Sequence, residues 1–576
     1  MIYENIYKDK LYKVDDYETI KEMLAFCKDT YGSKPAFWHK EVKAGEYKPI
    51  NFITFKDDVD ALGTRLLQLG LEGQNIAVIG ENCYSWVVAY FAIVCGVGKV
   101  VPLDKELSKE EIHNLIETAD CKAVFYTGTY KKVFDEMDIP FKFQMELYSS
   151  KVNQDDPDTI TRQIEEGRKL LGAGDRRYLD AVVTPDEVRM LLFTSGTTDV
   201  PKAVMLCHRN LISNIKDINR IVKVTPEDTS LSILPIHHTF ESTIGIMVVI
   251  SNGASVAFYE GLKYVAKNLA EAKASLLVGV PLIFESLYNK VWKTAEKSGK
   301  TKVLKTAIKV NNGLKKIGID ASKKLFASVH EAFGGRLRLL VTGAAAISPN
   351  VVRGFQDLGI SIVMGYGLTE TAPLLTGTPD WSDRYTKAGT VGQVVASGQM
   401  QIINKNEEGI GEVIYKGPNV MLGYYNMPEK TAEVLKDGWF YTGDLGFVDD
   451  QGNLYLTGRQ KNVIVTKTGK NIYPEEIEVV LSKIPYISEC MVYGTEEEAG
   501  ETIVSVQVIP DYELIQTDFG YTKEQQGEIY KLLKEQIAEV NQTLPNYKMV
   551  RNLVIRTTDF VKTTTKKIKR HENIPQ

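Results

Sequence analysis

Residues 193–204 read FTSGTTDVPKAV, a stretch of small hydroxyl side chains that ends in Pro201 and Lys202. Hydroxyls, open backbone amides and a lysine suit phosphate oxygens, because successive amide donors in a turn form an anion-binding concavity. Asp199 adds a negative charge to the same loop. A Walker P-loop is excluded, because Pro201 stands at its second glycine and Ala203 follows the lysine. Taken alone, the stretch fits either a nucleotide site or a polar surface turn.

Five further polar segments follow in order along the chain. TGAAAISPNV begins at Thr342 after the apolar run LRLLV, and MGYGLTETAP begins at Met364 after another apolar run. The remaining three are YTGDLG, GRQKNVIVTKTGKNIYPEEIE and TTTKKIKR. Open α/β sheets bind ligands where strands end in glycine-rich turns. Six such segments in one fixed order indicate a protein family much more specifically than any single segment does.

The elements that must position these segments alternate between helices and short apolar strands. The helical pattern FKDDVDALGTRLLQLG leads to the strand NIAVIG and then to a buried apolar helix at residues 86–98. CKAVFYTG, LLVGVP and LRLLVTGAA repeat the rhythm, which predicts an α/β fold. After Ala388 hairpin-like strands predominate, with a turn at residues 450–452. We therefore expect a large domain at residues 1–459 and a small α/β domain at residues 460–576.

Length and composition restrict the class of protein. The chain of 576 residues is too long for one compact domain, since a domain averages roughly 150 residues. A net charge of -5 gives no overall basic field for nucleic acid. The six cysteines contain no CxxC pair, so reduced thiols are expected rather than a zinc cage or a disulfide framework. No signal-peptide pattern opens the chain and no apolar run reaches the about 20 residues of a membrane span, which favours a cytoplasmic protein.

Residues 290–324 are unusually rich in lysine. They carry eleven lysines against only Glu296 and Asp320, with apolar residues such as Val303 and Leu314 between them. The pattern fits an amphipathic surface in peripheral contact with a membrane. It fits a solvated helical face equally well, because lysine is common on exposed helices. The sequence leaves both interpretations open.

In their order, the six segments resemble the adenylate-forming (AMP-binding) superfamily of acyl-CoA synthetases, adenylation domains and luciferases, most closely bacterial long-chain fatty acid–CoA ligases. The resemblance covers residues 51–570. It implies two layered α/β sheets and a small β-barrel in the large domain, followed by a mobile C-terminal lid domain. It also implies the use of ATP, Mg²⁺ and coenzyme A in lipid metabolism. A fatty acid would become an acyl adenylate with release of pyrophosphate, and CoA would then take the acyl group and leave AMP.

The resemblance assigns nucleotide-binding roles to residues of the large domain. The β- and γ-phosphates of ATP would be held by Thr194, Ser195, Gly196, Thr197, Thr198 and Lys202. The adenine would lie against Gly343, Ala344 and Ala345, with Tyr366, flanked by Gly365 and Gly367, stacked on its ring. Thr369 would contact the α-phosphate. Glu370 and Thr194 would hold Mg²⁺, a hard cation that prefers oxygen ligands.

Other roles fall near the C-terminus and at a histidine. Asp444 would accept hydrogen bonds from both ribose hydroxyls beside Arg459. Lys567 would bridge the substrate carboxylate and the α-phosphate, whose repulsion a cation reduces. The lid would swing about Lys461, and the loop around Gly469, which has no side chain, would let pantetheine pass.

The acyl site is the least defined part of the resemblance. His238 would lie beside the acyl and thiol tunnel. The apolar runs TIGIMVVI and GVPLIFESLY would line an acyl pocket, or they belong to the ordinary core. Two other outcomes stay open for the protein: transfer to the thiol of a carrier protein instead of CoA, and an acyl- or nucleotide-binding homologue that does not turn over.

Three positions depart from the family pattern. Asp199 replaces glycine or serine, and Ala203 and Lys566 replace glycine. An unpaired carboxylate about 4 Å from a phosphate charge costs on the order of 4 kcal/mol at an effective dielectric of roughly 20. Asp199 either meets Lys566 when the lysine loop closes, so that the charges cancel, or points into solvent. Additive effects of reverting each residue to glycine, singly and together, would exclude the pairing.

Overall fold

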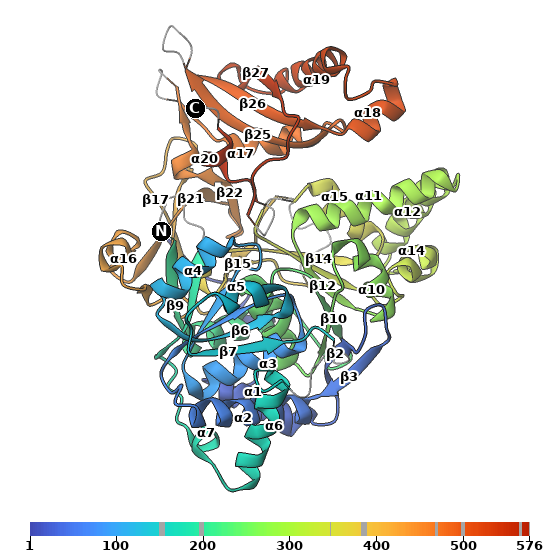
Figure 1. The fold of residues 1–576 in the computed structure, drawn as a ribbon. Coiled ribbons are helices and arrows are strands. Elements are labelled where there is room, and N and C mark those ends of the chain that lie inside the picture. The colour runs from blue at the N-terminus through green and yellow to red at the C-terminus, as the bar shows by residue number, and fades with distance from the viewer. Residues whose placement is uncertain are drawn as a thin grey trace. The chain divides into compact units, whose positions relative to one another are not determined.

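The computed structural model describes residues 1–148, 156–194, 201–345, 347–381, 389–466, 470–496, 502–563 and 567–574. The chain forms two compact units, drawn in Figure 1. The large unit contains residues 3–399 and 416–440, and the small unit contains residues 1–2, 400–415 and 441–576. The proposed lid boundary between residues 459 and 460 lies inside the small unit and stays a prediction.

Seven strands form the first sheet of the large unit, in the order β19-β9-β8-β5-β4-β6-β7. The strands β4, β5, β6, β7 and β8 run parallel, and β9 is antiparallel to both β8 and β19. Their bounds are β4 (Asn75–Ile79), β5 (Lys99–Leu103), β6 (Cys121–Thr127), β7 (Phe141–Met145), β8 (Val188–Thr194), β9 (Lys202–Cys207) and β19 (Gly423–Tyr424). Strands buried on both faces read as continuous apolar runs, which explains the patterns NIAVI and CKAVFYT.

Nine strands form the second sheet, in the order β16-β15-β14-β13-β12-β10-β11-β2-β3. The central strands β10 to β14 are parallel, together with β2. The bounds are β2 (Pro35–Lys40), β3 (Tyr47–Asn51), β10 (Thr229–Ser232), β11 (Ser255–Phe258), β12 (Leu276–Gly279), β13 (Leu339–Thr342), β14 (Ser361–Gly367), β15 (Leu374–Gly377) and β16 (Gln393–Val394). The predicted strand end before Gly343 is therefore confirmed, whereas β14 continues through the glycine-rich segment as far as Gly367.

Helices of the large unit begin at the side chains that favour helix starts. Thr19 and Ser108 each accept a hydrogen bond in a capping box, and Asn51 caps the helix predicted after residue 51. The predicted buried helix is α3 followed by a π-helical turn, η2 (Ile93–Val97). The main helices are α1 (Ile20–Tyr31), α2 (Phe52–Gln68), α3 (Tyr84–Ala92), α4 (Lys109–Thr118), α6 (Ile160–Gly172), α8 (His208–Ile221), α10 (Val265–Glu271), α11 (Pro281–Lys297), α12 (Thr301–Lys316), α13 (Ser322–Leu325), α14 (Ala327–Ala332), α15 (Pro349–Asp357) and α16 (Pro428–Val434).

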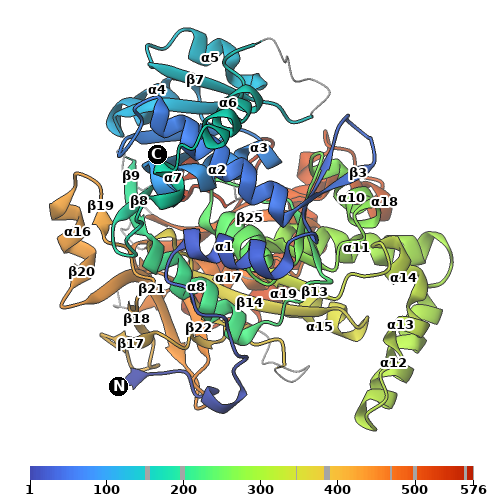
Figure 2. The ribbon, with the colours of Figure 1, turned by 90° about the horizontal axis from the view of Figure 1, so that it is seen from below.

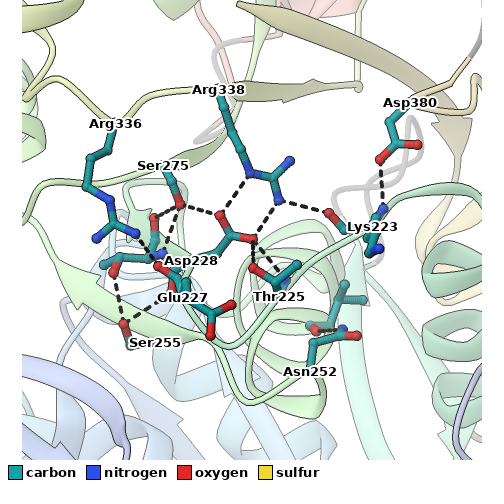
Figure 3. A network of polar contacts seen from close by, with 12 residues as sticks. Lys223, Thr225, Glu227, Asp228, Asn252, Ser255, Ser275, Arg336, Arg338 and Asp380 are labelled. Carbon is teal, nitrogen blue, oxygen red and sulfur yellow. Dashed lines mark hydrogen bonds and ion pairs between the residues drawn. The ribbon is translucent and has the colours of Figure 1, made fainter.

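A buried polar network joins the amino ends of three parallel strands (Figure 3). Arg338 makes a bidentate pair with Asp228, at 2.9 Å from Nε and 2.6 Å from Nη2. The Ser275 hydroxyl donates to the same carboxylate at 2.7 Å, and the Thr225 amide does so at 2.9 Å. Asp228 is 4% exposed, so its charge needs these partners. The network holds β10, β12 and β13 in register at the edge opposite their carboxyl ends.

The small unit contains two larger sheets and the strand pair β23 (Ile464–Val465) and β24 (Asn471–Ile472). One has the strand order β1-β17-β18-β21, with β22 paired to β21, and includes the predicted hairpin with its turn at Gly452, where φ is 78°. The described strands pair as an open sheet rather than the closed barrel that we expected. Its bounds are β1 (Ile2–Tyr3), β17 (Gln399–Ile403), β18 (Gly411–Lys416), β21 (Trp439–Val448) and β22 (Leu454–Arg459).

The second sheet of the small unit is a three-stranded layer under helices. Apolar side chains of its strands and of α17 and α19 form one core, which includes Leu481, Val506 and Leu533. The bounds are β25 (Ile487–Glu496), β26 (Thr502–Pro510), β27 (Val550–Ile555), α17 (Pro474–Leu481), α18 (Tyr512–Phe519), α19 (Gln526–Asn541) and α20 (Arg570–Asn573). Within the described ranges, no helix has both the length and the apolar content that a membrane span requires.

Candidate functional site

The two ends of the predicted phosphate loop lie side by side in a hairpin. Thr194 ends β8, Lys202 begins β9, and the two residues are paired across the ladder. The Thr194 hydroxyl donates to the Lys202 carbonyl at 3.3 Å. The loop residues between them, Ser195, Gly196, Thr197, Thr198 and Asp199, lie outside the described residues.

One departure from the family pattern has a structural explanation. Ala203 is 3% exposed and belongs to the apolar cluster that contains Leu191 and Val101. Its methyl group fills part of that cluster, because it points into the core and not toward the loop. Alanine in place of glycine is therefore compatible with the hairpin.

Tyr424, which the sequence analysis did not identify as a site residue, contacts both Lys202 and Glu370. The Tyr424 hydroxyl donates to Glu370 Oε1 at 2.9 Å, and Lys202 Nζ lies 5.1 Å from the centroid of the Tyr424 ring. Burial, and then the charge of Glu370, raise the pKa of Tyr424 well above its usual value. The phenol therefore stays protonated and orients the carboxylate. The only sequence signal was the pair of tyrosines in MLGYYN, which reads as ordinary strand.

The carboxylate of Glu370 suits a magnesium ion carried in by a polyphosphate. Among the described residues, no three His, Cys, Asp or Glu side chains form a metal cage. Mg²⁺ is commonly held by one or two carboxylates together with substrate phosphates and water. Glu370, at the 3₁₀ turn η7 (Thr369–Thr371), fits this arrangement, and Thr369 precedes it in the same turn.

The turn after β13 has the features of a ligand-binding loop. Ala344 has φ of 68°, a left-handed conformation that costs an alanine roughly 1–2 kcal/mol. A side chain at Gly343 would lie 3.2 Å from the Gly365 carbonyl and 3.4 Å from the Phe240 ring. Strained backbone of this kind is concentrated where ligands bind. The loop of Gly343, Ala344 and Ala345 thus follows directly on the carboxyl end of β13, as predicted.

Tyr366 lies on β14, with glycines on both sides. A Cβ on Gly367 would lie 1.7 Å from the Pro373 carbonyl oxygen, and one on Gly365 would lie 2.6 Å from Leu374. Gly367 therefore requires glycine, because the close atom belongs to the backbone, whereas a Cβ at Gly365 would need the Leu374 side chain to move. The Tyr366 side chain is 8% exposed. Its stacking on adenine stays a prediction.

His238 lies next to a second histidine that the sequence did not single out. The His237 and His238 ring centroids are 4.2 Å apart, and His237 Nε2 lies 3.6 Å from Asp104 Oδ2. Burial lowers the pKa of both imidazoles, and their mutual repulsion lowers that of His237 further. His238 is thus a neutral imidazole at pH 7. It lies just before the π-helix η5 (Phe240–Met247).

Glu241 is a fully buried carboxyl group in this π-helix. Its exposure is 0%, and no described residue makes a hydrogen bond of standard geometry to either oxygen. Ser232 and Leu234 are near enough to influence the carboxyl group, but burial dominates and raises its pKa to about 8. Glu241 is therefore protonated at neutral pH.

Replacing Glu241 with glutamine should flatten the dependence of stability on pH. The native carboxyl keeps its proton up to about pH 8, whereas the unfolded one loses it near 4.5. Between these values the native state binds more protons, so wild-type stability falls as pH rises, by about 1.4 kcal/mol per pH unit from this group. The difference in melting temperature between Glu241→Gln and wild type should increase from pH 5 to pH 8. The exposed Glu331→Gln serves as the control. Parallel profiles for Glu241→Gln and wild type would contradict the assignment.

An apolar cavity of about 40 Å³ is lined in part by residues of the π-helix η5 and the residues that follow it. The predicted run TIGIMVVI contributes Ile244, Val248 and Val249 to its wall, and β14 contributes Gly365. The run GVPLIFESLY, residues 279–288, contributes no side chain to this wall, although Leu276 and Val278 of the preceding strand β12 do. The wall is otherwise made of Ile218, Ile221, Val222, Val224, Leu339, Val341, Val363, Met364, Leu374 and Gly377.

The small unit positions Asp444, the residue that is predicted to bind the ribose of ATP. Asp444 and Arg459 are directly opposite each other on β21 and β22. Arg459 Nε lies 2.9 Å from Asp444 Oδ1, and the Asp444 amide donates to the Thr442 hydroxyl at 3.0 Å. Asp444 is 6% exposed. The carboxylate is therefore oriented by a charge-assisted contact, as an acceptor for two hydroxyls must be.

The predicted adenylation lysine lies in the electrostatic field of this pair. The Thr563 amide donates to the Lys567 carbonyl at 2.8 Å, and the Lys567 amide donates to the Thr563 hydroxyl at 3.1 Å. The Lys567 side chain is exposed, yet surrounding protein still removes enough water to lower its pKa. The charge of Arg459 lowers this pKa further, whereas Asp444 raises it. The fold thus brings together residues 123 positions apart, counted from Asp444 to Lys567.

Three further predicted residues belong to the proposed lid: Lys461, Gly469 and Lys566. Lys461 lies in the 3₁₀ turn η8 (Gln460–Asn462) and is exposed, which is compatible with a hinge. Gly469 and Lys566 lie outside the described residues.

Comparison with known proteins agrees with the arrangement. The family of AMP-binding enzymes matches residues 27–425. Long-chain-fatty-acid–CoA ligase 5 of Rattus norvegicus is 30% identical over 539 residues, covering 87% of this chain and 77% of that protein. Long-chain-fatty-acid–CoA ligase 1 of Homo sapiens is 29% identical over 505 residues, covering 81% and 71%.

A solved structure shares the fold. The anthranilate CoA ligase crystallised with anthranoyl-AMP superposes with a TM-score of 0.75 at 17% identity, covering 98% of this chain and 96% of that one. The expected α/β fold of adenylate-forming enzymes is thereby confirmed. The family match covers more than half of this chain, and the fold agrees with it. The chain therefore belongs to the AMP-binding enzymes.

Proposed function

We propose that the protein activates a long-chain fatty acid with ATP and transfers the acyl group to coenzyme A. The fatty acid carboxylate attacks the α-phosphorus of ATP and pyrophosphate leaves. The CoA thiol then attacks the acyl carbonyl of the adenylate, and AMP leaves. The long-chain substrate is suggested by the names of the rat and human relatives, each matched over more than four fifths of this chain.

The observation that carries the proposal is Lys567 in the field of Asp444 and Arg459. Asp444 would bind the ribose of ATP, so a cation in its neighbourhood is near the nucleotide. Carboxylate and phosphate repel each other, and a lysine placed between them lowers the barrier to attack through charge stabilisation and orientation. Two positive groups, Lys567 and Arg459, thus serve the adenylation half-reaction in this proposal.

The large unit would supply the remaining contacts to ATP. Lys202 and the Thr194 hydroxyl would bind the β- and γ-phosphates, and Thr369 the α-phosphate. Mg²⁺ held by Glu370, with Thr194 as a further ligand, would neutralise phosphate charge. Tyr424 fixes the Glu370 carboxylate for this role through its hydrogen bond of 2.9 Å.

The apolar wall of the cavity would suit an acyl tail only once the cavity has opened. A cavity of about 40 Å³ has room for only a few water molecules, at roughly 10–15 Å³ each. A long tail therefore requires side chains of the wall, such as Ile244 and Ile218, to change rotamer. Neutral His238 beside the segment could accept the proton of the thiol.

A pyrophosphate-exchange assay across carboxylic acids tests the proposal. We expect Mg²⁺-dependent exchange that rises along the straight-chain series from acetate to stearate and is weak with benzoate. Adding CoA should yield the acyl-CoA and AMP. Thioester formation only on a phosphopantetheinyl carrier protein would instead establish the carrier-protein alternative. ATP binding without exchange for any acid would identify a homologue that does not turn over.

A further inference from the structure

Helix α12 exposes a line of large apolar side chains. Val303 is 66% exposed, Val310 49% and Ile317, which ends the helix, 71%. They are spaced by seven residues, close to two turns of 3.6, so they lie along one side of the helix. The line runs about 21 Å at 1.5 Å per residue. A row of this kind on a water-exposed helix indicates a contact surface.

A row of lysines runs beside the apolar row. Lys302, Lys309 and Lys316 each directly precede one of the three apolar residues, and all three are exposed. No acidic residue occurs between Glu296 and Asp320. The face is therefore both apolar and strongly positive, without the interspersed negative charges of an ordinary solvated helix.

A neighbouring side of α12 is fixed by polar contacts. Asn311 is the one residue of the helix that is fully buried, and its Nδ2 donates to the Ser322 hydroxyl at 2.8 Å. Its Oδ1 accepts from the Ala321 amide at 3.1 Å, and Lys315 Nζ donates to the Gln356 carbonyl at 2.9 Å. These bonds set the rotation of the helix, so the apolar row faces outward by construction.

Further exposed apolar and basic residues follow the end of the helix. Ile319 is 52% exposed and Leu325, at the end of α13, is 41% exposed, next to the exposed Lys323 and Lys324. Figure 2 shows α12 projecting from the large unit, with α13 adjoining it. A projecting element can reach a flat surface before the rest of the unit does.

We propose that this surface, defined by Val303, Val310, Ile317 and the three lysines that precede them, docks on a lipid bilayer that contains anionic headgroups. The apolar row enters the boundary between headgroups and acyl chains, and the lysines contact lipid phosphates. The paired rows favour a membrane over a protein groove, because a bilayer offers apolar and anionic layers in parallel planes. The proposal does not depend on the substrate of the enzyme.

Sedimentation of the full-length protein with vesicles tests this docking. We expect binding to phosphatidylcholine vesicles that contain phosphatidylglycerol and little binding to phosphatidylcholine alone. The triple change Lys302→Glu, Lys309→Glu and Lys316→Glu should weaken binding at least tenfold. The triple change Val303→Ser, Val310→Ser and Ile317→Ser should weaken binding by a similar factor relative to wild type. This difference from wild type should persist at high salt, because salt screens charge but not apolar burial.

A matched variant separates the position of the charges from their number. Lys523→Glu, Lys531→Glu and Lys534→Glu alter exposed lysines of the small unit and change the net charge equally, so binding should stay within twofold of wild type. Melting temperatures of all variants check folding. Equal loss in this variant, wild-type binding by the α12 variants, or no binding of the wild type to anionic vesicles would each overturn the proposal.

Discussion

Replacing Lys567 with alanine should abolish fatty-acid-dependent pyrophosphate exchange and leave thiolysis of supplied acyl adenylate almost unchanged. The ammonium is the group that we place between the substrate carboxylate and the α-phosphate. Removing one such preorganised charge contact typically costs on the order of 10²–10³-fold in rate. Thiolysis needs no new bond to the α-phosphate, so the same change should reduce it less than about threefold.

The design of this experiment uses the local structure of the segment. Lys567 is held through its backbone by Thr563, and a bridge joins Lys562 to Ile568, so truncating the side chain leaves the segment in place. Lys569→Ala is the matched control, because Lys569 belongs to the same segment but pairs with Glu572 at 3.0 Å. Equal loss of both half-reactions in Lys567→Ala would refute the assigned role.

Glu370→Gln should reduce adenylation by on the order of 10²-fold and shift its dependence on magnesium to higher concentration. Glutamine keeps the shape of the side chain but not the charge that a hard cation requires. Pyrophosphate exchange, measured as a function of MgCl₂ concentration at saturating ATP, checks both effects. An unchanged rate and an unchanged magnesium dependence would exclude Glu370 as the ligand.

Tyr424→Phe provides the graded comparison. This variant keeps the carboxylate and the aromatic ring near Lys202 but loses the 2.9 Å hydrogen bond to Glu370. A hydrogen bond to a charged group contributes about 1.5–3 kcal/mol, of which only the orienting part affects the reaction. We expect a loss of about tenfold, well below that of Glu370→Gln. A larger loss than in Glu370→Gln would show that Tyr424 acts in its own right.

The sequence alone determined the parts of the fold that depend on neighbouring residues. Apolar runs that lead into glycine-rich segments predicted the strand before Gly343 and the strand that contains Gly365, since period and turn chemistry are local properties. The hairpin of β21 and β22 was likewise readable from its turn, and this places Arg459 opposite Asp444. The order of the glycine-rich segments was sufficient to indicate the family, and the family match over residues 27–425 agrees with it.

The tertiary structure alone decided contacts between distant segments and the burial of single side chains. Tyr424 and Glu370 are 54 positions apart, and nothing local marks their hydrogen bond. No local pattern marks Glu241 as buried, yet packing against Gly245 and its surroundings buries it completely. The outward rotation of α12 depends on what Asn311 meets, so periodicity left its lysine face ambiguous. Burial and long-range pairing arise from the free energy of the whole packed chain, which no local pattern contains.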